Sequence, residues 1–312
     1  MASTIVSNNV LTMLIYMLCG FLLVKTKKME ADHAKSISAF LVYVCGSCMV
    51  IGAFQSMEYS LDLFASAMIF FAATLLIQLL FFVLLYIILN KKLKNPQTAR
   101  YRILAAGSTM GNVGFFGLPL VTALFPDQPI VACYSTLYCT SMNLIVFTLG
   151  VYMITNDRKY VSVKKAILNP TFLSTLVAVP LYLLQFHFPP VIGNAVTLLG
   201  KTTTPICLLV LGMRLASMEF KKTFTRPIIY VICALKLIVF PLFAYACVYF
   251  LPFVDETFKT CVFVLSAAPT AAVVLSLAEV HECERRMCAN VVSISTLLSV
   301  ITIPLMMLIV TR

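Results

Sequence analysis

Uncharged, apolar stretches of about 20 residues recur along the whole sequence. A helix needs about 20 such residues to cross the ~30 Å hydrocarbon core of a bilayer, so each stretch is long enough to be a transmembrane helix. With 61% hydrophobic and 11% charged residues, the chain also has more apolar surface than a soluble protein of 312 residues could bury. The sequence therefore predicts an all-α integral membrane protein of ten transmembrane helices, at residues 5–24, 36–55, 63–90, 103–125, 130–154, 167–187, 191–213, 227–250, 258–279 and 287–310.

The basic residues are confined almost entirely to every second connection between the predicted spans. The connections after spans 1, 3, 5, 7 and 9 hold 19 of the 23 Lys and Arg residues. Because connections rich in Lys and Arg stay in the cytoplasm, this alternation predicts a multi-pass protein of the cell (plasma or inner) membrane with both termini outside. Membrane topology thus accounts for the formal net charge of +11, and no nucleic-acid partner is expected.

An odd number of spans in each half gives the two halves opposite orientations in the membrane. The first five spans fall in residues 1–155 and the last five in residues 166–312, with a short cytoplasmic linker at 156–165. This is the arrangement of inverted-repeat transporters. Unusual residues recur at similar places in the two halves, which favours such a repeat; the pairs are Pro119 and Pro269, Gly46 and Pro205, and Gln78 and Lys236.

The fourth predicted span contains residues that weaken a helix, in the stretch MGNVGFFGLPL at 110–120. A proline inside a helix removes a backbone hydrogen bond, and each glycine costs about 1 kcal/mol relative to alanine. The freed backbone groups are tolerated at membrane depth only where protein buries them or where they line an aqueous cavity. Span 9 has the same character, since small residues flank Pro269. We therefore expect helices 4 and 9 to be broken and to cross near the membrane midplane.

Two crossed, broken helices would form a binding site for an anion. The N-termini of the half-helices present free amides and positive partial charge there. The alternative is that the glycines only allow close helix packing, with Gly111, Gly114 and Gly117 on one packing face. The residues expected to bind substrate are Gly111, Asn112, Gly114, Pro119, Asn143, Lys201, Lys236, Pro269 and Thr270.

Lys201 and Lys236 are the only charged residues deep within predicted spans, each about ten residues and hence ~15 Å from a span end. A charge at this depth costs at least ~2.5 kcal/mol, so these lysines either attract substrate or pair with carbonyls freed by the breaks. No Asp or Glu occupies the centre of a span, which leaves only neutral ligands such as Gln78, Ser293 and Thr296 for a coupling cation. This pattern favours export of an anion driven by the membrane potential over sodium- or proton-coupled symport.

Four segments, in order and spacing, resemble the auxin efflux carrier family: GNVGFFGLPLVTALFP at 111–126, NLIVFTLGVY at 143–152, TTTPICLLVLGMRLA at 202–216 and SAAPTAAVVLSLAE at 266–279. The resemblance covers almost the whole chain, and the short middle loop is similar to that of bacterial members. It implies a ten-helix fold like those of bile-acid/sodium symporters and sodium/proton antiporters, with crossed helices 4 and 9. It also implies an elevator motion, a homodimer and transport of small organic anions such as auxin, malate or malonate.

The resemblance also implies residue roles. Asn112 matches the family's crossover asparagine, and Pro119 and Pro269 match its crossover prolines. The chain departs from the family at VCGSCMV, 44–50, where many members carry a proline in helix 2. The predicted function is secondary transport of small carboxylates by an elevator mechanism. A membrane sensor built on a transporter fold is the alternative from another class, and no enzyme activity, metal or cofactor is expected.

Overall fold

The computed structural model describes residues 2–30, 32–95, 98–125, 127–162, 164, 167–216 and 226–310. These residues form helices joined by turns, with one isolated β-bridge. The helices of the first half are α1 (Ala2–Lys25), α2 (His33–Phe40), η1 (Leu41–Cys45), α3 (Gly46–Gln55), α4 (Leu61–Leu93), α5 (Ala99–Thr109), η2 (Val113–Gly117), α6 (Leu118–Leu124), α7 (Ile130–Ile145), η3 (Val146–Gly150), α8 (Val151–Thr155) and η4 (Arg158–Tyr160).

The second half repeats this pattern of long and interrupted helices. Its helices are α10 (Pro170–Leu183), α11 (Pro190–Ala216), α13 (Pro227–Ala234), η5 (Leu235–Val239), α14 (Phe240–Tyr249), α15 (Glu256–Ser266), α16 (Ala272–Val280) and α17 (Arg285–Val310). The segments η1, η2, η3 and η5 are single π-helical turns, whereas η4 is a 3₁₀ turn.

Five helical segments of the described chain are long and apolar enough to cross a membrane, and the bent α17 makes a sixth. The five are residues 33–55, 61–93, 130–155, 190–216 and 227–249. Each of the other predicted spans overlaps a helix that is shorter or interrupted: the apolar part of α1, α10, and the pairs α5–α6 and α15–α16. The chain is therefore a multi-pass, all-helical membrane protein, and the number of ten spans stays a prediction.

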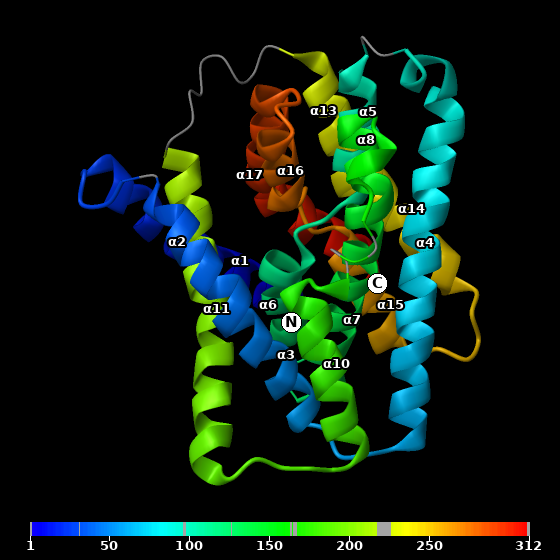
Figure 1. The fold of residues 1–312 in the computed structure, drawn as a ribbon. Helices are drawn as coiled ribbons and strands as arrows, with labels where there is room; N and C mark the ends of the chain where they lie inside the picture. Colours follow the sequence, from blue (N-terminus) through cyan, green and yellow to red (C-terminus); the bar gives the residue numbers. More distant parts are fainter. Residues whose placement is uncertain are drawn as a thin grey trace.

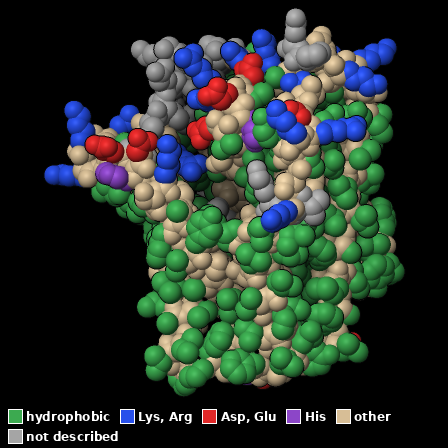
Figure 2. All heavy atoms as spheres, viewed as in Figure 1, with side chains coloured by type: hydrophobic (Ala, Val, Ile, Leu, Met, Phe, Trp, Pro, Cys, Tyr) green, Lys and Arg blue, Asp and Glu red, His purple; other side chains and the backbone are tan. Residues whose placement is uncertain are grey.

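The long helices run between two ends of the molecule (Figure 1). The connections that follow α1, α4 and α16 lie at the upper end, and those that follow α3, α10 and α14 lie lower. Figure 2 shows that nearly all Lys, Arg, Asp and Glu side chains visible on this face gather at the upper end, above a surface of hydrophobic side chains. A bilayer needs such an apolar surface, and the predicted cytoplasmic connections share the charged end.

The helices pack in two groups. In the α11 group, α11 packs along α1 and α3, and α10 packs along α3. In the α5 group, α4 packs along α5 and α7, α14 along α15, and α17 along α13 and α16. The groups meet where α3 and α10 contact α7 and where α1 contacts α6. The functional site described below lies at this boundary.

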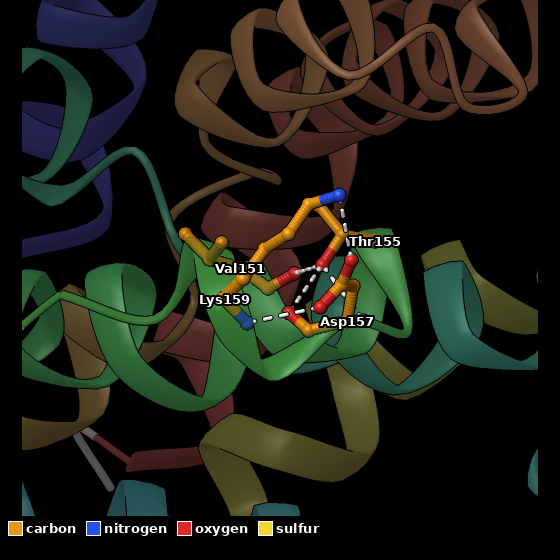
Figure 3. Close-up of polar contacts among 4 residues, drawn as sticks. All are labelled: Val151, Thr155, Asp157 and Lys159. Atoms are coloured by element: carbon orange, nitrogen blue, oxygen red, sulfur yellow. Dashed lines mark hydrogen bonds and ion pairs between the residues drawn. The ribbon is translucent and has the colours of Figure 1, made fainter.

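A tight turn ends the first half of the chain (Figure 3). Asn156, with φ 57°, is in the left-handed region that asparagine tolerates, and it caps α8. The Thr155 hydroxyl donates to the Val151 carbonyl at 2.8 Å, and the Asp157 amide donates to that hydroxyl at 3.2 Å. The Asp157 carboxylate accepts the Lys159 amide at 2.9 Å and pairs with its ammonium at 3.1 Å. These contacts hold the pKa of the Asp157 carboxyl below its usual value.

Candidate functional site

The fourth predicted span is interrupted at residues 110–112. Helix α5 ends at Thr109, Met110 has extended backbone angles, and helical structure resumes at Val113. The break therefore lies before Pro119, which is the second residue of α6. Because η2 runs directly into α6, Pro119 lies within the resumed helix, where it removes one backbone hydrogen bond without ending the helix. The side chain of Pro119 lies outside the described part of the structure.

The ninth predicted span is interrupted at residues 267–271, around Pro269. Helix α15 ends at Ser266, Ala271 is extended with φ −67° and ψ 138°, and α16 begins at Ala272. Proline lacks a backbone N–H and disfavours the helical conformation of the residue before it, so α15 cannot continue through this position.

The two breaks are hydrogen-bonded to each other. The Asn112 amide donates to the Pro269 carbonyl at 2.7 Å, and the Ala271 amide donates to the Met110 carbonyl at 3.0 Å. These bonds form an antiparallel bridge between Gly111 and Thr270. Each break thereby satisfies backbone groups that the other has freed, as burial at membrane depth requires.

The breaks occupy equivalent places in the two halves, although not through the residues that the sequence analysis matched. Thr109 ends α5 and Ser266 ends α15, a separation of 157 residues, and the same separation relates Asn112 to Pro269. Pro119 and Pro269 are 150 residues apart. Their predicted correspondence is therefore displaced by seven residues, because Pro119 belongs to the helix that follows the break.

Thr270 stabilises the bridge through two further hydrogen bonds. Its hydroxyl donates to the Gly107 carbonyl at 2.9 Å, and its amide donates to the Ser295 hydroxyl of α17 at 3.1 Å. Thr270 is fully buried and is not among the cavity-lining residues, so it holds the break in place. The role of Ser295 was missed from the sequence, because a serine in an apolar helix gives no sign of its partner.

A cavity of about 190 Å³ opens beside the paired breaks, between the two helix groups. The break residues Gly111, Asn112, Val113 and Gly114 form one wall, and Val42, Gly46, Met49 and Val50 of η1 and α3 face them. The remaining lining residues come from α7, η3, the start of α10 and the start of α16: Ser135, Thr136, Cys139, Met142, Asn143, Phe147, Asn169, Thr171, Ala271, Ala272 and Val273. The described lining thus combines apolar and neutral polar side chains, and none of its residues is Asp or Glu.

Three helical segments begin at this cavity. They are η2 with α6, α16, and α10, whose N-cap Asn169 accepts the Thr171 amide at 3.0 Å. The first amides of a helix have no intrahelical acceptor and carry the positive end of the helix dipole. The contribution of α10 was missed, although Asn169 followed by Pro170 is a typical helix start.

Two asparagines predicted to bind substrate, Asn112 and Asn143, line the cavity. The Asn143 side-chain amide donates to the Asn169 side chain at 3.4 Å. Among the described residues, the buried Ser135 hydroxyl has no hydrogen-bond partner, and the Asn112 side chain is part of the cavity lining. Both side chains can therefore contact a bound ligand. Ser135 and Thr136 were not predicted, but polar residues within an apolar span are a usable signal.

Lys236 lies directly behind the Gly111 wall of the cavity. Its side chain is 0% exposed, and its ammonium donates to the Ser266 carbonyl, at the C-terminal end of α15, at 2.8 Å. The ammonium also lies 4.5 Å from the centre of the Phe240 ring. The negative end of a helix dipole and an aromatic face both stabilise a cation. The sequence analysis gave two roles for this lysine, attraction of substrate or pairing with a carbonyl freed by a break. The contact with Ser266 is of the second kind.

The other predicted site residues lie away from the cavity lining. Lys201 is exposed on α11. Gln78, on α4, donates to the Thr74 carbonyl and the Ser141 hydroxyl, both at 2.9 Å, whereas Ser293 and Thr296 lie on α17. Among the described residues, no hydrogen bond joins Gln78 to Ser293 or Thr296, and no group of three or more His, Cys, Asp or Glu could hold a metal ion.

The four π-helical turns lie around the breaks. η1 and η3 contribute Val42 and Phe147 to the cavity lining, η2 contributes Val113 and Gly114, and η5 carries Lys236. A π turn inserts one extra residue into a helix and so redirects the side chains beside it, and such turns occur frequently at functional sites.

Two segments of the chain, residues 5–163 and 158–307, match the family model described as membrane transport protein, which is the domain of the auxin efflux carriers. The two matches meet within the predicted linker at 156–165. The comparison with curated proteins finds no match. Because the matched segments cover nearly the whole chain, the protein belongs to the auxin efflux carrier family of membrane transport proteins and is a transporter, not an enzyme.

Proposed function

We propose that the protein is a secondary transporter of small organic anions, and that the cavity at the paired breaks binds the substrate. One observation carries this proposal: three helical N-termini converge on a cavity that no Asp or Glu among the described residues lines. Their amides and dipoles favour an anion over a cation. The side-chain amides of Asn112 and Asn143 supply further donors.

The cavity suits a carboxylate with a small organic body. Its polar wall carries the Asn112 side chain and the start of the helix that resumes after the break, while Val42, Met49 and Val50 of the facing wall offer apolar contact. A carboxylate would bind at the first wall and its organic part would pack on the second. Auxin-like monocarboxylates and the dicarboxylates malate and malonate, which family membership suggests, are the compounds to test.

Movement of the α5 group against the α11 group would carry the cavity between the two sides of the membrane. The position of the cavity at the boundary of these groups supports an elevator of this kind, since either group can shift as a packed unit. In this proposal helices 4 and 9, each broken, cross within an inverted repeat of five and five spans. The protein would work as a homodimer in the cell membrane, with both termini outside.

The membrane potential would drive export. With the inside negative, an exiting monoanion gains about 2.3 kcal/mol per 100 mV. Sodium- or proton-coupled symport is the alternative, and it would need a site for the coupling ion. Gln78 lies on α4, whereas Ser293 and Thr296 lie one turn apart on α17, and none of the three lines the cavity, which favours the uncoupled mechanism over sodium symport. A sensor on the same fold would bind the anion without moving it.

Flux measurements in liposomes test the proposal. The purified protein is reconstituted, a potassium diffusion potential is imposed with valinomycin, and the flux of radiolabelled indole-3-acetate, malate and malonate is followed with and without a sodium gradient. We expect saturable, voltage-driven flux of at least one compound. Asn112→Ala should reduce it more than about tenfold, because each lost charge-assisted hydrogen bond is worth about 1.5–3 kcal/mol.

Asn194→Ala is the matched control, because Asn194 is exposed on α11, away from the cavity lining. Flux that requires sodium would replace the voltage-driven mechanism by symport. Saturable binding without flux would identify a sensor. Absence of both binding and flux for every carboxylate would overturn the proposed substrate class.

A further inference from the structure

A buried ammonium group lies beside the cavity without a carboxylate to balance it. The elements packed against η5 are α5, α13, α14 and α17, and none of them contains Asp or Glu. In α15, which contacts the Lys236 ammonium through Ser266, the carboxylate nearest in sequence is Glu256 in the first turn, about 15 Å away along the helix. Among the described residues, the ammonium of Lys236 contacts the Ser266 carbonyl and the Phe240 ring.

Gly111 separates this ammonium from the cavity by the thickness of the backbone. Gly111 lines the cavity on one side. On its other side, a Cβ atom at this residue would lie 2.9 Å from the Lys236 nitrogen and 3.2 Å from its Cε. The absence of a side chain at Gly111 is therefore what lets the ammonium approach the break. An anion bound in the cavity beside Gly111 would lie on the other side of this backbone from the positive charge.

We infer that Lys236 is the counter-charge of the transported anion, so that the loaded carrier is electrically neutral for a monoanion. The inference rests on the proposed function and adds how the charge of the substrate is balanced. A buried cation and a buried anion each pay a desolvation cost that they reduce for one another in a low-dielectric site. Anion binding and the protonated form of Lys236 therefore stabilise each other.

No other described group near Lys236 takes this role. The ionisable side chains of α5, α13, α14 and α17 are phenols, thiols and guanidinium groups, and none of these balances the charge of an ammonium at neutral pH. They are Arg100, Tyr101, Arg102, Tyr230, Cys233, Tyr245, Cys247, Tyr249, Arg285, Arg286 and Cys288. Arg102 is at the start of α5, nine residues before Gly111 and about 13 Å along the chain axis.

If the inference holds, the step that moves the substrate does not depend on the membrane potential, and any voltage dependence comes from the return of the empty carrier. A neutral loaded carrier crosses the membrane without doing electrical work. The empty carrier returns either with the ammonium, which then moves inward with the inside-negative potential, or as the neutral amine, after its proton has left with the anion. The first return gives export driven by the potential, and the second gives proton-coupled transport of the anion.

Exchange at equal concentrations tests the loaded carrier alone. Liposomes hold equal indole-3-acetate on both sides at pH 7.5, a trace of radiolabelled indole-3-acetate is added outside, and its entry is timed at imposed potentials of 0 and −100 mV. Wild type should exchange at rates within about twofold of each other. In Lys236→Met the loaded carrier has a net charge of −1. Its exchange rate should differ about sevenfold between 0 and −100 mV if this charge crosses half of the membrane potential before the transition state.

Further variants distinguish the effect of the charge at residue 236 from the effect of the shape of its side chain. Lys236→Arg retains the charge and should exchange independently of voltage, whereas Lys236→Gln should behave like Lys236→Met. Lys259→Met is the matched control, because Lys259 pairs with Glu256 at the start of α15, away from the cavity. Circular dichroism and gel filtration check that each variant folds.

The outcomes decide the inference. Voltage-independent exchange in wild type and Lys236→Arg, with voltage-dependent exchange in the two neutral variants, supports it. Exchange that depends on voltage in wild type overturns it, even if both neutral variants fail to fold. Exchange that stays independent of voltage in folded Lys236→Met also overturns it, although the proposed function then survives. Absence of saturable flux for every carboxylate overturns the proposed function and this inference together.

Discussion

The backbone amide of Asn112 donates a 2.7 Å hydrogen bond to the carbonyl of Pro269, which joins the two halves of the chain where each has lost its helix. Neither break can satisfy its own freed groups, since water is excluded at membrane depth. The two halves must therefore assemble together for either broken helix to be stable. The same bridge aligns the N-termini of the resumed helices on one cavity.

Replacement of Gly111 by alanine should uncouple the lysine from the site. The new Cβ would lie 2.9 Å from the Lys236 nitrogen, and the flexible end of that side chain can move away, so the fold should survive. We expect carboxylate flux to fall at least about tenfold, the loss of one charge-assisted interaction. The measurement is flux in liposomes, with the thermal unfolding midpoint as the check on folding.

Gly52→Ala is the control for this change, because the nearest atom to a Cβ there is 3.9 Å away. It should transport like wild type. Wild-type flux in Gly111→Ala would show that the close approach of Lys236 to the break is unimportant.

Replacement of Ser295 by alanine should destabilise the bridge without touching the cavity lining. The change leaves the buried Thr270 amide without its 3.1 Å acceptor, and an unpaired buried donor costs about 1–3 kcal/mol. Chemical unfolding in detergent measures this loss. Ser276→Ala, on the exposed face of α16, should cost much less, and equal stability of the two variants would contradict the role given to Ser295.

Replacement of Gly212 by alanine should separate α1 from α11. A Cβ at this residue would lie 1.9 Å from the Met17 carbonyl oxygen, and a backbone atom cannot move aside as a side chain can. Overpacking of this kind costs typically 1–3 kcal/mol or more. We expect a lower unfolding midpoint and poorer yield of folded protein. Gly193→Ala, with its nearest contact at 3.9 Å, should be neutral, and equal stability of Gly212→Ala and wild type would refute this packing.

The contacts of Asp157 predict that their contribution to the free energy of unfolding is constant near neutral pH. Hydrogen bonds from Lys159 lower the pKa of the Asp157 carboxyl, and the same contact raises the pKa of the Lys159 ammonium. The carboxyl therefore adds stability above its ordinary pKa of about 3.9 and loses it as pH falls through the lowered value. The ammonium adds stability below about pH 10.4 and loses it only as pH rises through the raised value.

Thermal unfolding of wild type and Asp157→Asn across pH 3–9 checks this expectation. The difference between them should be small, constant from about pH 5 to 9, and should shrink toward pH 3. Asp32→Asn, which removes an exposed pair with Lys35, is the control and should have no comparable profile. A difference that changes between pH 6 and 8 would contradict the contacts assigned to Asp157.

The sequence predicted helical segments and the interruptions near Gly111 and Pro269, because both depend on local residue chemistry. Apolar runs of sufficient length are helices in lipid, and Pro269 cannot be inside one. Asn112 and Gly111 stood out as helix-weakening residues in an apolar span, and both line the cavity. Family membership, inferred from four segments, is confirmed by the family match.

The sequence could not predict which residues meet across the fold. The bridge of Gly111 to Thr270 and the contact of Thr270 with Ser295 depend on long-range packing, which no local pattern encodes. Pro119 was matched with Pro269 because a proline in an apolar span looks disruptive, yet helical structure resumes at Val113, six residues before Pro119. Lys201 and Lys236 were indistinguishable by depth, and only packing places one on the surface and the other behind the cavity.

Ligand-dependent thermal stabilisation tests the central claim most directly, namely that the cavity at the paired breaks holds an organic anion. A ligand that binds only the folded protein stabilises it by about 2.7 kcal/mol at 100 times its dissociation constant. Wild type and Asn112→Ala are unfolded with the carboxylate panel, with the uncharged amides of the same compounds and with alkylammonium ions. We predict saturable stabilisation of wild type by at least one carboxylate, none by its amide or by the cations, and loss of the effect in Asn112→Ala. Stabilisation by cations, or by carboxylates equally in wild type and Asn112→Ala, would contradict the account.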